Sequence, residues 1–183
     1  MDPLALIVAR IKGDLAAVRS LLRAGADVHA REPSYQYTAL SEAAYKGHTA
    51  VVRELLRAGA RVEDKDINGC TALDQVFMEG YLDVVRVLLA AGASVHTRNK
   101  KQQTPLYGAA EYGQAAVIRV LVHEGRARVE DKDVDGGTAL HIACQNGQVE
   151  AVCALLAARA DVHARTKLQA NPCTQRLWVG EKL

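Results

Sequence analysis

Aromatic side chains are scarce in this sequence: they make up 4% of the 183 residues, although 49% of the residues are hydrophobic. The core must therefore be built mainly from alanine, leucine and valine. Such small and aliphatic side chains suit closely packed helices better than the two facing sheets of a β-sandwich. The composition argues against an all-β fold, and a chain of this length can bury a large apolar core.

A strong charge of either sign is also absent, because the formal net charge is only +2 at pH 7. Chains whose main task is to wrap nucleic acid usually carry a strongly basic face that shows in the total charge. Nucleic acid is therefore a poor candidate for the main partner.

Cysteine pairs at metal-binding spacing are missing as well. The sequence contains no Cys-x-x-Cys motif, whereas zinc sites and disulfide frameworks need convergent cysteine spacing. We expect no metal or disulfide role, and we interpret two of the four cysteines as small core or lightly exposed thiols. The four are Cys70, Cys144, Cys153 and Cys173.

The sequence also lacks long hydrophobic runs and nucleotide-binding loops. The apolar run from Leu4 to Ala9 is too short for a signal peptide or a membrane span, and no basic region precedes it. No Gly-x-x-x-x-Gly-Lys-Ser/Thr motif or dinucleotide fingerprint occurs. We therefore expect a cytoplasmic or nuclear protein without membrane attachment, small-molecule substrate or cofactor.

What the sequence does contain is an internal repeat, seen most clearly in residues 133–147. Its centre is the motif Thr138-Ala-Leu-His141, and related motifs occur at steps of 33 or 34 residues. A period of this length is typical of stacked architectures in which each copy is one supersecondary unit. The related motifs are Thr38-Ala-Leu-Ser41, Thr71-Ala-Leu-Asp74 and Thr104-Pro-Leu-Tyr107.

Two further marks define each copy as a pair of helices. One glycine separates the two helices, and a Gly-Ala pair ends the second helix. The Gly-Ala pair takes one inserted residue at Gly125-Arg-Ala127 and fails at Arg159-Ala160. In the first copy, the pattern predicts helices from Asp2 to about Lys12 and from Leu15 to Ala24. The separating glycines are Gly13, Gly47, Gly80, Gly113 and Gly147.

Five copies follow from these marks and form one predicted repeat domain, residues 1–164. Their approximate bounds are 1–32, 33–65, 66–98, 99–132 and 133–164. After Ala164 the pattern weakens. We interpret residues 165–183 as a partial sixth repeat or cap, with Trp178 packed on the fifth repeat; a free tail, a docking peptide and a truncated larger protein are the alternatives.

The spacing, together with Thr104-Pro105-Leu106 and the Thr-x-Leu-His motif of Thr138 to His141, resembles the ankyrin repeat family over residues 4 to about 163. The resemblance implies a short β-hairpin turn, an inner helix and an outer helix per repeat. It also implies stacking into a curved, all-α solenoid that binds other proteins on its concave side. The residues agree independently, because each copy has too few apolar side chains to bury a face alone.

Three copies depart from the family motif at the start of the inner helix. There the family's threonine caps the helix and its histidine bonds back toward the turn, but Ser41, Asp74 and Tyr107 replace the histidine. In the third copy, Asp74-Gln-Val-Phe77 also replaces a small Ala-Ala pair with larger side chains. We expect that repeat to be locally distorted or less stable.

A longer period of 67 residues underlies the shorter one. Residues 61–66 and 128–133 share the sequence Arg-Val-Glu-Asp-Lys-Asp, so acidic and histidine-bearing hairpin tips alternate. The tip histidines His29, His96 and His163 lie two repeats apart, about 20 Å at roughly 10 Å per packed layer, and cannot share a metal. No catalytic group is therefore expected. The other histidines have structural interpretations: His48, His123 and His141.

An arginine recurs at one position of successive outer helices, and two more follow one turn later. We interpret them as a ladder on the convex side. Such a ladder is either a solvated face whose stems shield apolar surface or a binding surface for phosphate or nucleic acid. The lack of interleaved aromatic residues favours the solvated face. The arginines are Arg19, Arg53, Arg86 and Arg119, with Arg23 and Arg57.

The family's variable, partner-contacting positions give the candidate binding residues. Tyrosine and methionine are enriched at protein interfaces, where a large ring buries area at little entropic cost. For Tyr35 and Tyr37, in a loop without the usual Asp and Gly, packing within the hairpin is an equally open interpretation. The hairpin candidates are Tyr35, Tyr37, Ile67, Lys100, Lys101, Gln103, Val134 and Asp135. The inner-helix candidates are Tyr45, Lys46, Met78, Glu79, Glu111, Tyr112, Gln145 and Asn146.

The sequence therefore predicts a non-catalytic protein–protein interaction module of adaptor or scaffold type. Tyr45, Tyr112 and, as a third candidate, Tyr37 would anchor the partner protein. Lys46, Lys100 and Lys101 would steer an acidic partner. We expect the chain to be a monomer or a weak homodimer. One alternative function is a self-associating structural repeat protein. The other is binding of phosphate or nucleic acid on the arginine ladder.

Overall fold

The computed structural model describes residues 13–77, 79–168 and 171–172, which divide into two compact units, residues 1–94 and 95–183. Eight α-helices and one short 3₁₀-helix occur in these described residues, without a β-sheet. An isolated antiparallel bridge joins Arg31 and Thr38. The predicted all-α class is confirmed. The expected helix from Asp2 to Lys12, the candidate Met78 and the expected cap around Trp178 lie outside the described residues.

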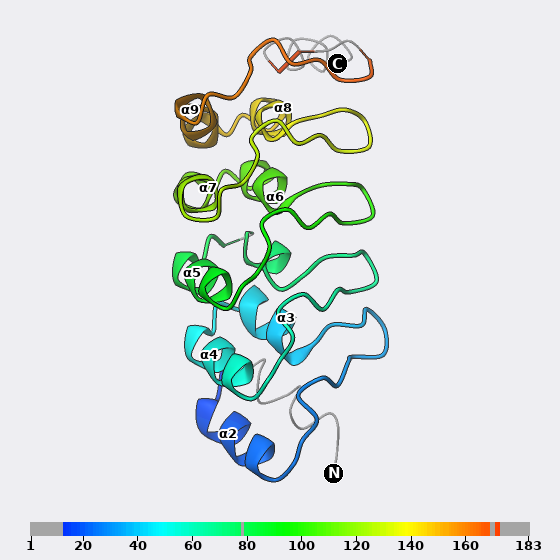
Figure 1. Ribbon diagram of the computed structural model, residues 1–183, viewed down its shortest axis with the longest axis vertical. Coiled ribbons are helices and arrows are strands. Elements are labelled where there is room, and N and C mark those ends of the chain that lie inside the picture. Colours follow the sequence, from blue (N-terminus) through cyan, green and yellow to red (C-terminus); the bar gives the residue numbers. More distant parts are fainter. Residues whose placement is uncertain (1–12, 78, 169–170, 173–183) are drawn as a thin grey trace. The chain divides into compact units, whose positions relative to one another are not determined.

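The first unit contains α2 (Leu15–Arg23), α3 (Ala39–Tyr45), α4 (Thr49–Arg57), η1 (Asp74–Val76) and α5 (Leu82–Ala90). The outer helices α2, α4 and α5 form one row, and α4 contacts both of the others (Figure 1). The inner elements α3 and η1 contact each other, and the hairpin loops project on their side (Figure 1). The predicted helix from Leu15 to Ala24 is confirmed to within one residue.

The second unit repeats this arrangement with α6 (Pro105–Glu111), α7 (Ala115–His123), α8 (Ala139–Gln145) and α9 (Val149–Ala157). The inner helices α6 and α8 contact each other, as do the outer helices α7 and α9. Each inner helix also packs on the outer helix that follows it in the chain. Both units therefore consist of inner and outer helices that alternate along the sequence, as the repeat marks predict.

Aliphatic side chains fill the core of both units, as the composition predicts. The inner helices add fully buried alanines, Ala43 and Ala44 in α3 and Ala109 and Ala110 in α6, whose small side chains allow close packing. Full burial of one large aliphatic side chain contributes about 1.5–3 kcal/mol. The largest fully buried aliphatic residues include Leu40, Leu55, Leu73, Leu88, Leu106, Ile118, Leu121, Leu140 and Leu155.

Three of the inner elements, α3, η1 and α8, start at a threonine whose amide donates to the side chain three residues later. Thr38 donates from its amide to Ser41 Oγ at 2.9 Å, and Ser41 returns its amide to Thr38 Oγ1 at 3.1 Å. In the fifth copy, the Thr138 amide donates to His141 Nδ1 at 3.2 Å. Serine thus replaces the histidine without loss of the reciprocal cap, which satisfies amides that the helix start leaves unpaired.

Asp74 fills the same role in the third copy but heads a much shorter helix. Its Oδ2 accepts the Thr71 amide at 2.7 Å and the Thr71 hydroxyl at 2.9 Å. Burial raises the pKa of this carboxyl to about 6, against the lowering effect of the two bonds. Among the described residues of this copy only η1 forms at this position, and Val76 and Phe77 are buried where the second and fourth copies have two alanines. The predicted distortion is confirmed, whereas the lower stability stays a prediction.

Several turns adopt a left-handed backbone without glycine. Gly25, Gly59 and Gly92 end their outer helices at φ between 85° and 91°, and Arg126 and Arg159 occupy the corresponding places at φ 60° and 64°. The interpretation of Gly125 as the helix-ending glycine is therefore wrong by one residue. The residue with positive φ at the end of α7 is Arg126, not Gly125. A left-handed conformation costs a non-glycine residue about 1–2 kcal/mol.

The 67-residue period corresponds to a recurring set of bonds between hairpins. Arg31 donates to the Lys65 carbonyl at 2.6 Å and pairs with Asp64 at 3.1 Å. In the second unit, Arg98 makes the equivalent contacts at 2.8 Å and 2.9 Å with Lys132 and Asp131. The glutamate before each of these aspartates accepts a backbone amide from the hairpin region that follows in the sequence. Glu63 accepts the Ser94 amide, and Glu130 accepts the Asp161 amide, both at 2.8 Å.

Candidate protein-binding surface

The hairpin before α3 presents two stacked tyrosines. The ring centroids of Tyr35 and Tyr37 lie 5.6 Å apart, with the ring planes at 23°. The Glu32 carboxylate holds the loop by accepting the amides of Ser34 and Tyr35 at 2.6 and 2.7 Å, in place of the usual aspartate. Tyr37 is half-buried, while Tyr35 remains 54% exposed. The Tyr37 ring thus packs within the hairpin, while the Tyr35 ring is left accessible to a partner.

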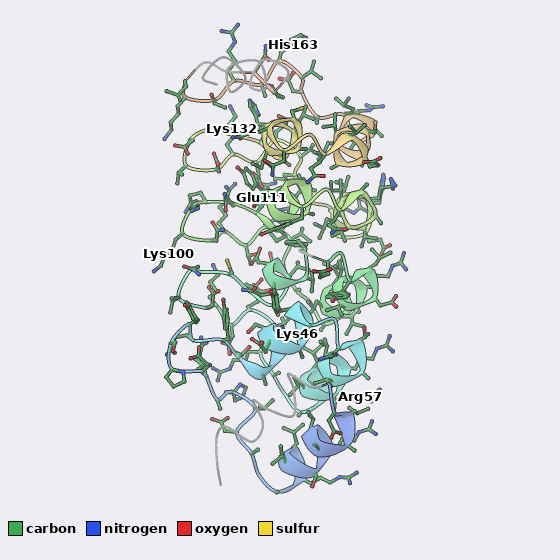
Figure 2. All side chains as sticks on the ribbon, turned by 180° about the vertical axis from the view of Figure 1, so that it is seen from behind. Lys46, Arg57, Lys100, Glu111, Lys132 and His163 are labelled. Atoms are coloured by element: carbon green, nitrogen blue, oxygen red, sulfur yellow. The ribbon has the colours of Figure 1, made fainter. Side chains whose placement is uncertain are left out.

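The end of α3 adds a third tyrosine with a cation on its ring. The Lys46 ammonium lies 4.8 Å from the centroid of the Tyr45 ring, and Figure 2 shows Lys46 at this end of α3. Ile67 belongs to the next hairpin, is 39% exposed, and donates its amide to the Tyr35 carbonyl at 3.1 Å. These contacts bring the predicted residues of the first unit onto the hairpin and inner-helix side.

A hollow of about 340 Å³ opens on the same side of the first unit. Its walls come from the hairpin, from α3 and from η1, and the lining residues are Tyr37, Ser41, Glu42, Tyr45 and Gln75. Burial raises the pKa of the Tyr37 phenol first, and the nearby carboxylates of Asp66 and Glu42 raise it further. The hollow therefore combines two aromatic rings with negative charge.

Glu42 and Gln75 line the hollow but are not among the site residues predicted from the sequence. Both stand four positions after the cap threonine of their copy, Thr38 and Thr71. Glu42 also precedes Tyr45 by three residues, so the two lie on one face of α3. This spacing was the available signal, but the contribution of η1 depends on how neighbouring repeats stack.

The second unit places two lysines at the tip of its first hairpin. Lys100 and Lys101 are exposed, and Lys100 lies at the tip in Figure 2. Asn99 Oδ1 accepts the amides of Lys101 and Gln103 at 2.9 and 3.0 Å, and Asn99 Nδ2 donates to Gln103 Oε1 at 3.0 Å. The Gln103 side chain is thus engaged within the hairpin, while the lysines are presented outward.

The inner helices of the second unit expose one tyrosine and several polar groups. Tyr112, at the end of α6, is 45% exposed. Asn146 donates to the Glu111 carbonyl at 3.0 Å and so joins the ends of α6 and α8. Gln145 beside it is exposed. The predicted residues of these two helices therefore form one neighbourhood.

The next hairpin of this unit exposes the remaining candidates. Val134 is 42% exposed and donates its amide to the Lys101 carbonyl at 3.1 Å. Asp135 is also exposed, and its carbonyl accepts the Lys167 amide at 2.9 Å. Backbone bonds between successive hairpins thus hold these side chains in place.

Tyr107 replaces a family histidine but has a different role. Burial, followed by the charge and hydrogen bond of Asp133, raises the pKa of its phenol far above the usual value. A hydrogen bond to Gln103 acts in the opposite direction. The Tyr107 hydroxyl therefore ties α6 to both neighbouring hairpins and serves the scaffold.

The outer helices expose the predicted arginines. In the first unit, Arg19, Arg53 and Arg86 hold the same helix position and are exposed. Glu54 pairs with Arg19 at 3.0 Å and lies 3.9 Å from Arg57, which Figure 2 shows on the outer-helix side. These pairs reduce the positive charge that this face offers to phosphate. In the second unit the position holds Arg119 in α7, and α9 has an exposed Cys153 instead.

Groups for metal or redox chemistry do not converge in the part of the chain that the structure describes. No three His, Cys, Asp or Glu side chains of these residues are placed to hold a metal ion. Cys70 and Cys144 are partly exposed and Cys153 is exposed, all three as free thiols; Cys173 lies outside the described residues. Among the described helices, none has the length and apolar character needed to cross a bilayer.

Comparison with known families agrees with this architecture. A family model described as "Ankyrin repeats (3 copies)" matches residues 5–99 and again residues 91–166. No curated protein matches the chain. The two matches together span the helix pairs of both compact units. The chain therefore belongs to the ankyrin repeat family, whose repeats are generally protein–protein interaction modules.

Proposed function

We propose that this ankyrin repeat protein is a non-catalytic adaptor or scaffold that binds a partner protein on its hairpin and inner-helix side. The observation that supports this most directly is the exposure of large apolar side chains on that side of each unit. They are Tyr35 and Ile67 in the first unit and Val134 and Tyr112 in the second, each 39–54% exposed.

Such side chains suit the centre of an interface. A tyrosine ring offers a large rigid area and a hydroxyl that can pair at the rim, and removal of apolar area from water stabilises a complex by about 25 cal/mol per Å². The loops that carry Tyr35, Ile67 and Val134 are bonded to their neighbours, as described above. Little ordering of these loops is therefore needed on binding, which favours affinity.

The lysines at the hairpin tip of the second unit support an acidic character in part of the partner. Lys100 and Lys101 are exposed and lie at the rim of this surface. Rim charges mainly raise the association rate, and salt screens that effect. Replacement of both lysines should slow association more than it accelerates dissociation.

The test is affinity purification with the wild-type chain and with a Tyr45→Ala, Tyr112→Ala double variant. We expect the double variant to capture the specific partner at least about 10-fold less well, since interface tyrosines contribute about 1–2 kcal/mol each. An Arg53→Ala, Arg119→Ala variant on the outer helices is the matched control and should capture normally. Equal capture by both variants, with unchanged circular dichroism, would show that the proposed surface is wrong.

Self-association is a second candidate that one observation favours. In α9, Val149 is 63% exposed and Leu156 is 42% exposed, so this outer helix presents apolar area. Two copies of the chain could cover it together. Light scattering over a concentration series would detect the dimer, and a constant monomer mass at high concentration would exclude it.

A further inference from the structure

We propose that the hollow beside α3 receives an arginine side chain of the partner, its guanidinium paired with Glu42 and lying against the rings of Tyr37 and Tyr45. This inference rests on the proposed function, because it names the partner chemistry that the same surface recognises. The other residues of the wall, Ser41 and Gln75, supply polar edges.

The size of the hollow fits one long side chain. Its volume of about 340 Å³ lies at the lower end of the roughly 300–1,000 Å³ typical of pockets that enclose small ligands. Its walls come from three separate elements, so the stacking of repeats fixes its shape. An extended partner segment that crosses the hairpins could insert one side chain here.

The charge of the hollow selects a cation. Glu42 lines the wall, and Asp66 Oδ2 accepts a hydrogen bond at 3.2 Å from Nε2 of Gln75, another lining residue. Among the described residues, the Glu42 carboxylate makes no hydrogen bond or ion pair. Glu42 is the one charged residue among the five that line the hollow, and both Glu42 and Asp66 act electrostatically on the Tyr37 phenol. A buried guanidinium would supply the missing counter-charge.

The aromatic walls accept cations, and the protein itself provides an example. The Lys46 ammonium lies 4.8 Å from the Tyr45 ring centroid, which is within the range of cation–π attraction. This contact is an observation independent of the carboxylates. It shows that the tyrosine at this site holds a positive group against its ring.

Arginine satisfies the site better than lysine. Its planar guanidinium stacks on aromatic faces and donates two parallel bonds to one carboxylate, while an ammonium is a more strongly hydrated point charge. The second unit does not repeat this chemistry, because Gly108 occupies the position of Glu42 after its cap threonine. The arginine site therefore belongs to the first unit.

The experiment is an NMR titration of the full, ¹⁵N-labelled chain with the blocked amide of arginine, at constant ionic strength. Amides of Tyr37, Glu42 and Gln75 should shift in a saturable manner, with a dissociation constant on the order of 1–10 mM for so small a probe. The blocked amide of lysine should bind more weakly. The blocked amide of citrulline, which has nearly the same shape but no charge, should not bind.

Single variants separate the contributions of the Glu42 carboxylate and the Tyr45 ring to arginine binding. Glu42→Gln should weaken arginine binding about 5- to 10-fold, and Tyr45→Ala should weaken it similarly, whereas Tyr45→Phe keeps the ring and should bind nearly as well as the wild type. Glu150→Gln, an exposed glutamate of α9, is the matched control and should change nothing. Binding of citrulline or lysine as tight as that of arginine, or an unchanged affinity in Glu42→Gln, would overturn the proposal.

Failure of the arginine-site proposal and failure of the proposed function give different results. If the Tyr45 and Tyr112 double variant loses its partner but arginine does not bind, the interaction surface stands and the arginine site is wrong. If arginine binds but the double variant captures the partner normally, the proposed surface is wrong and arginine binding has no role in partner recognition.

Discussion

At the scale of single residues, the start of the inner helix shows one role filled by different side chains. A serine hydroxyl, an aspartate carboxylate and a histidine nitrogen each accept the amide of the cap threonine. The sequence predicts the position of this cap, because the threonines repeat. It does not predict that Ser41 and Asp74 accept the threonine amide, whereas the Tyr107 hydroxyl bonds to Asp133. These differences depend on side-chain rotamers and on the neighbouring hairpin.

Asp74 makes the stability of the first unit depend on pH. The pKa of this carboxyl is raised from 3.8 to about 6 in the folded protein. The protonated form therefore favours folding, with full effect below pH 3.8, and the advantage is lost as the pH rises through about 6. The change amounts to on the order of 1–3 kcal/mol, at about 1.4 kcal/mol per pKa unit.

The Asp74→Asn variant isolates this effect, because asparagine keeps an acceptor oxygen and does not ionise. Its free energy of unfolding, relative to that of the wild type, should increase between pH 4 and 7 and level off above. Urea unfolding of both proteins at a series of pH values measures the difference. A difference that stays constant across this range would show that Asp74 has an ordinary pKa.

At the scale of elements, η1 is both the irregular inner helix and one wall of the hollow. The sequence indicated the irregularity through the bulky residues after Asp74, and it indicated Tyr37 and Tyr45 through the variable positions. It could not show that Gln75 and Glu42 line one hollow, because these residues come from different repeats. A pattern within one copy specifies the helices, whereas a site between copies depends on how they pack.

The short η1 should open more readily than its neighbour α3. Its few backbone bonds include Asp74 to the Thr71 carbonyl at 3.1 Å and Gln75 to the Ala72 carbonyl at 3.3 Å, and 3₁₀ geometry is weaker than that of an α-helix. Native-state hydrogen exchange should therefore show lower protection for residues 74–77 than for residues 39–45 of α3. Equal protection of the two segments would mean that the third repeat is distorted without being less stable.

At the scale of the whole molecule, periodicity made most of the fold predictable. A step of 33 or 34 residues fixed the helix pairs, and the 67-residue step pointed to a block of two repeats. The reason for the longer step appeared only in the structure, as the contacts of Arg31 and Arg98 with the acidic hairpin that follows each of them. These are contacts between copies, which a motif search within one copy does not reveal.

Arg98→Lys tests whether these contacts stabilise the second unit. Arg98 donates to the carbonyls of Gln102 and Lys132 and pairs with Asp131. A lysine ammonium cannot reproduce this forked geometry, so we expect a loss of about 1 kcal/mol, which lowers the melting temperature by about 2–4 °C. Arg119→Lys on α7, an exposed arginine, is the control and should leave the melting temperature unchanged. Equal melting temperatures for the two variants would contradict a stabilising role for Arg98.

The alternation of two kinds of hairpin also restricts how the number of repeats in this chain could change. Arginine at residues 31 and 98 alternates with lysine at residues 65 and 132, and each arginine bonds to the lysine hairpin that comes next. A gene duplication of 67 residues preserves the match of every arginine with its acceptor. An insertion of a single repeat would set two hairpins of one kind side by side and leave a guanidinium or a carboxylate without its counterpart. We therefore expect duplication or deletion of a pair of repeats to preserve these contacts, whereas duplication or deletion of a single repeat should lose some of them.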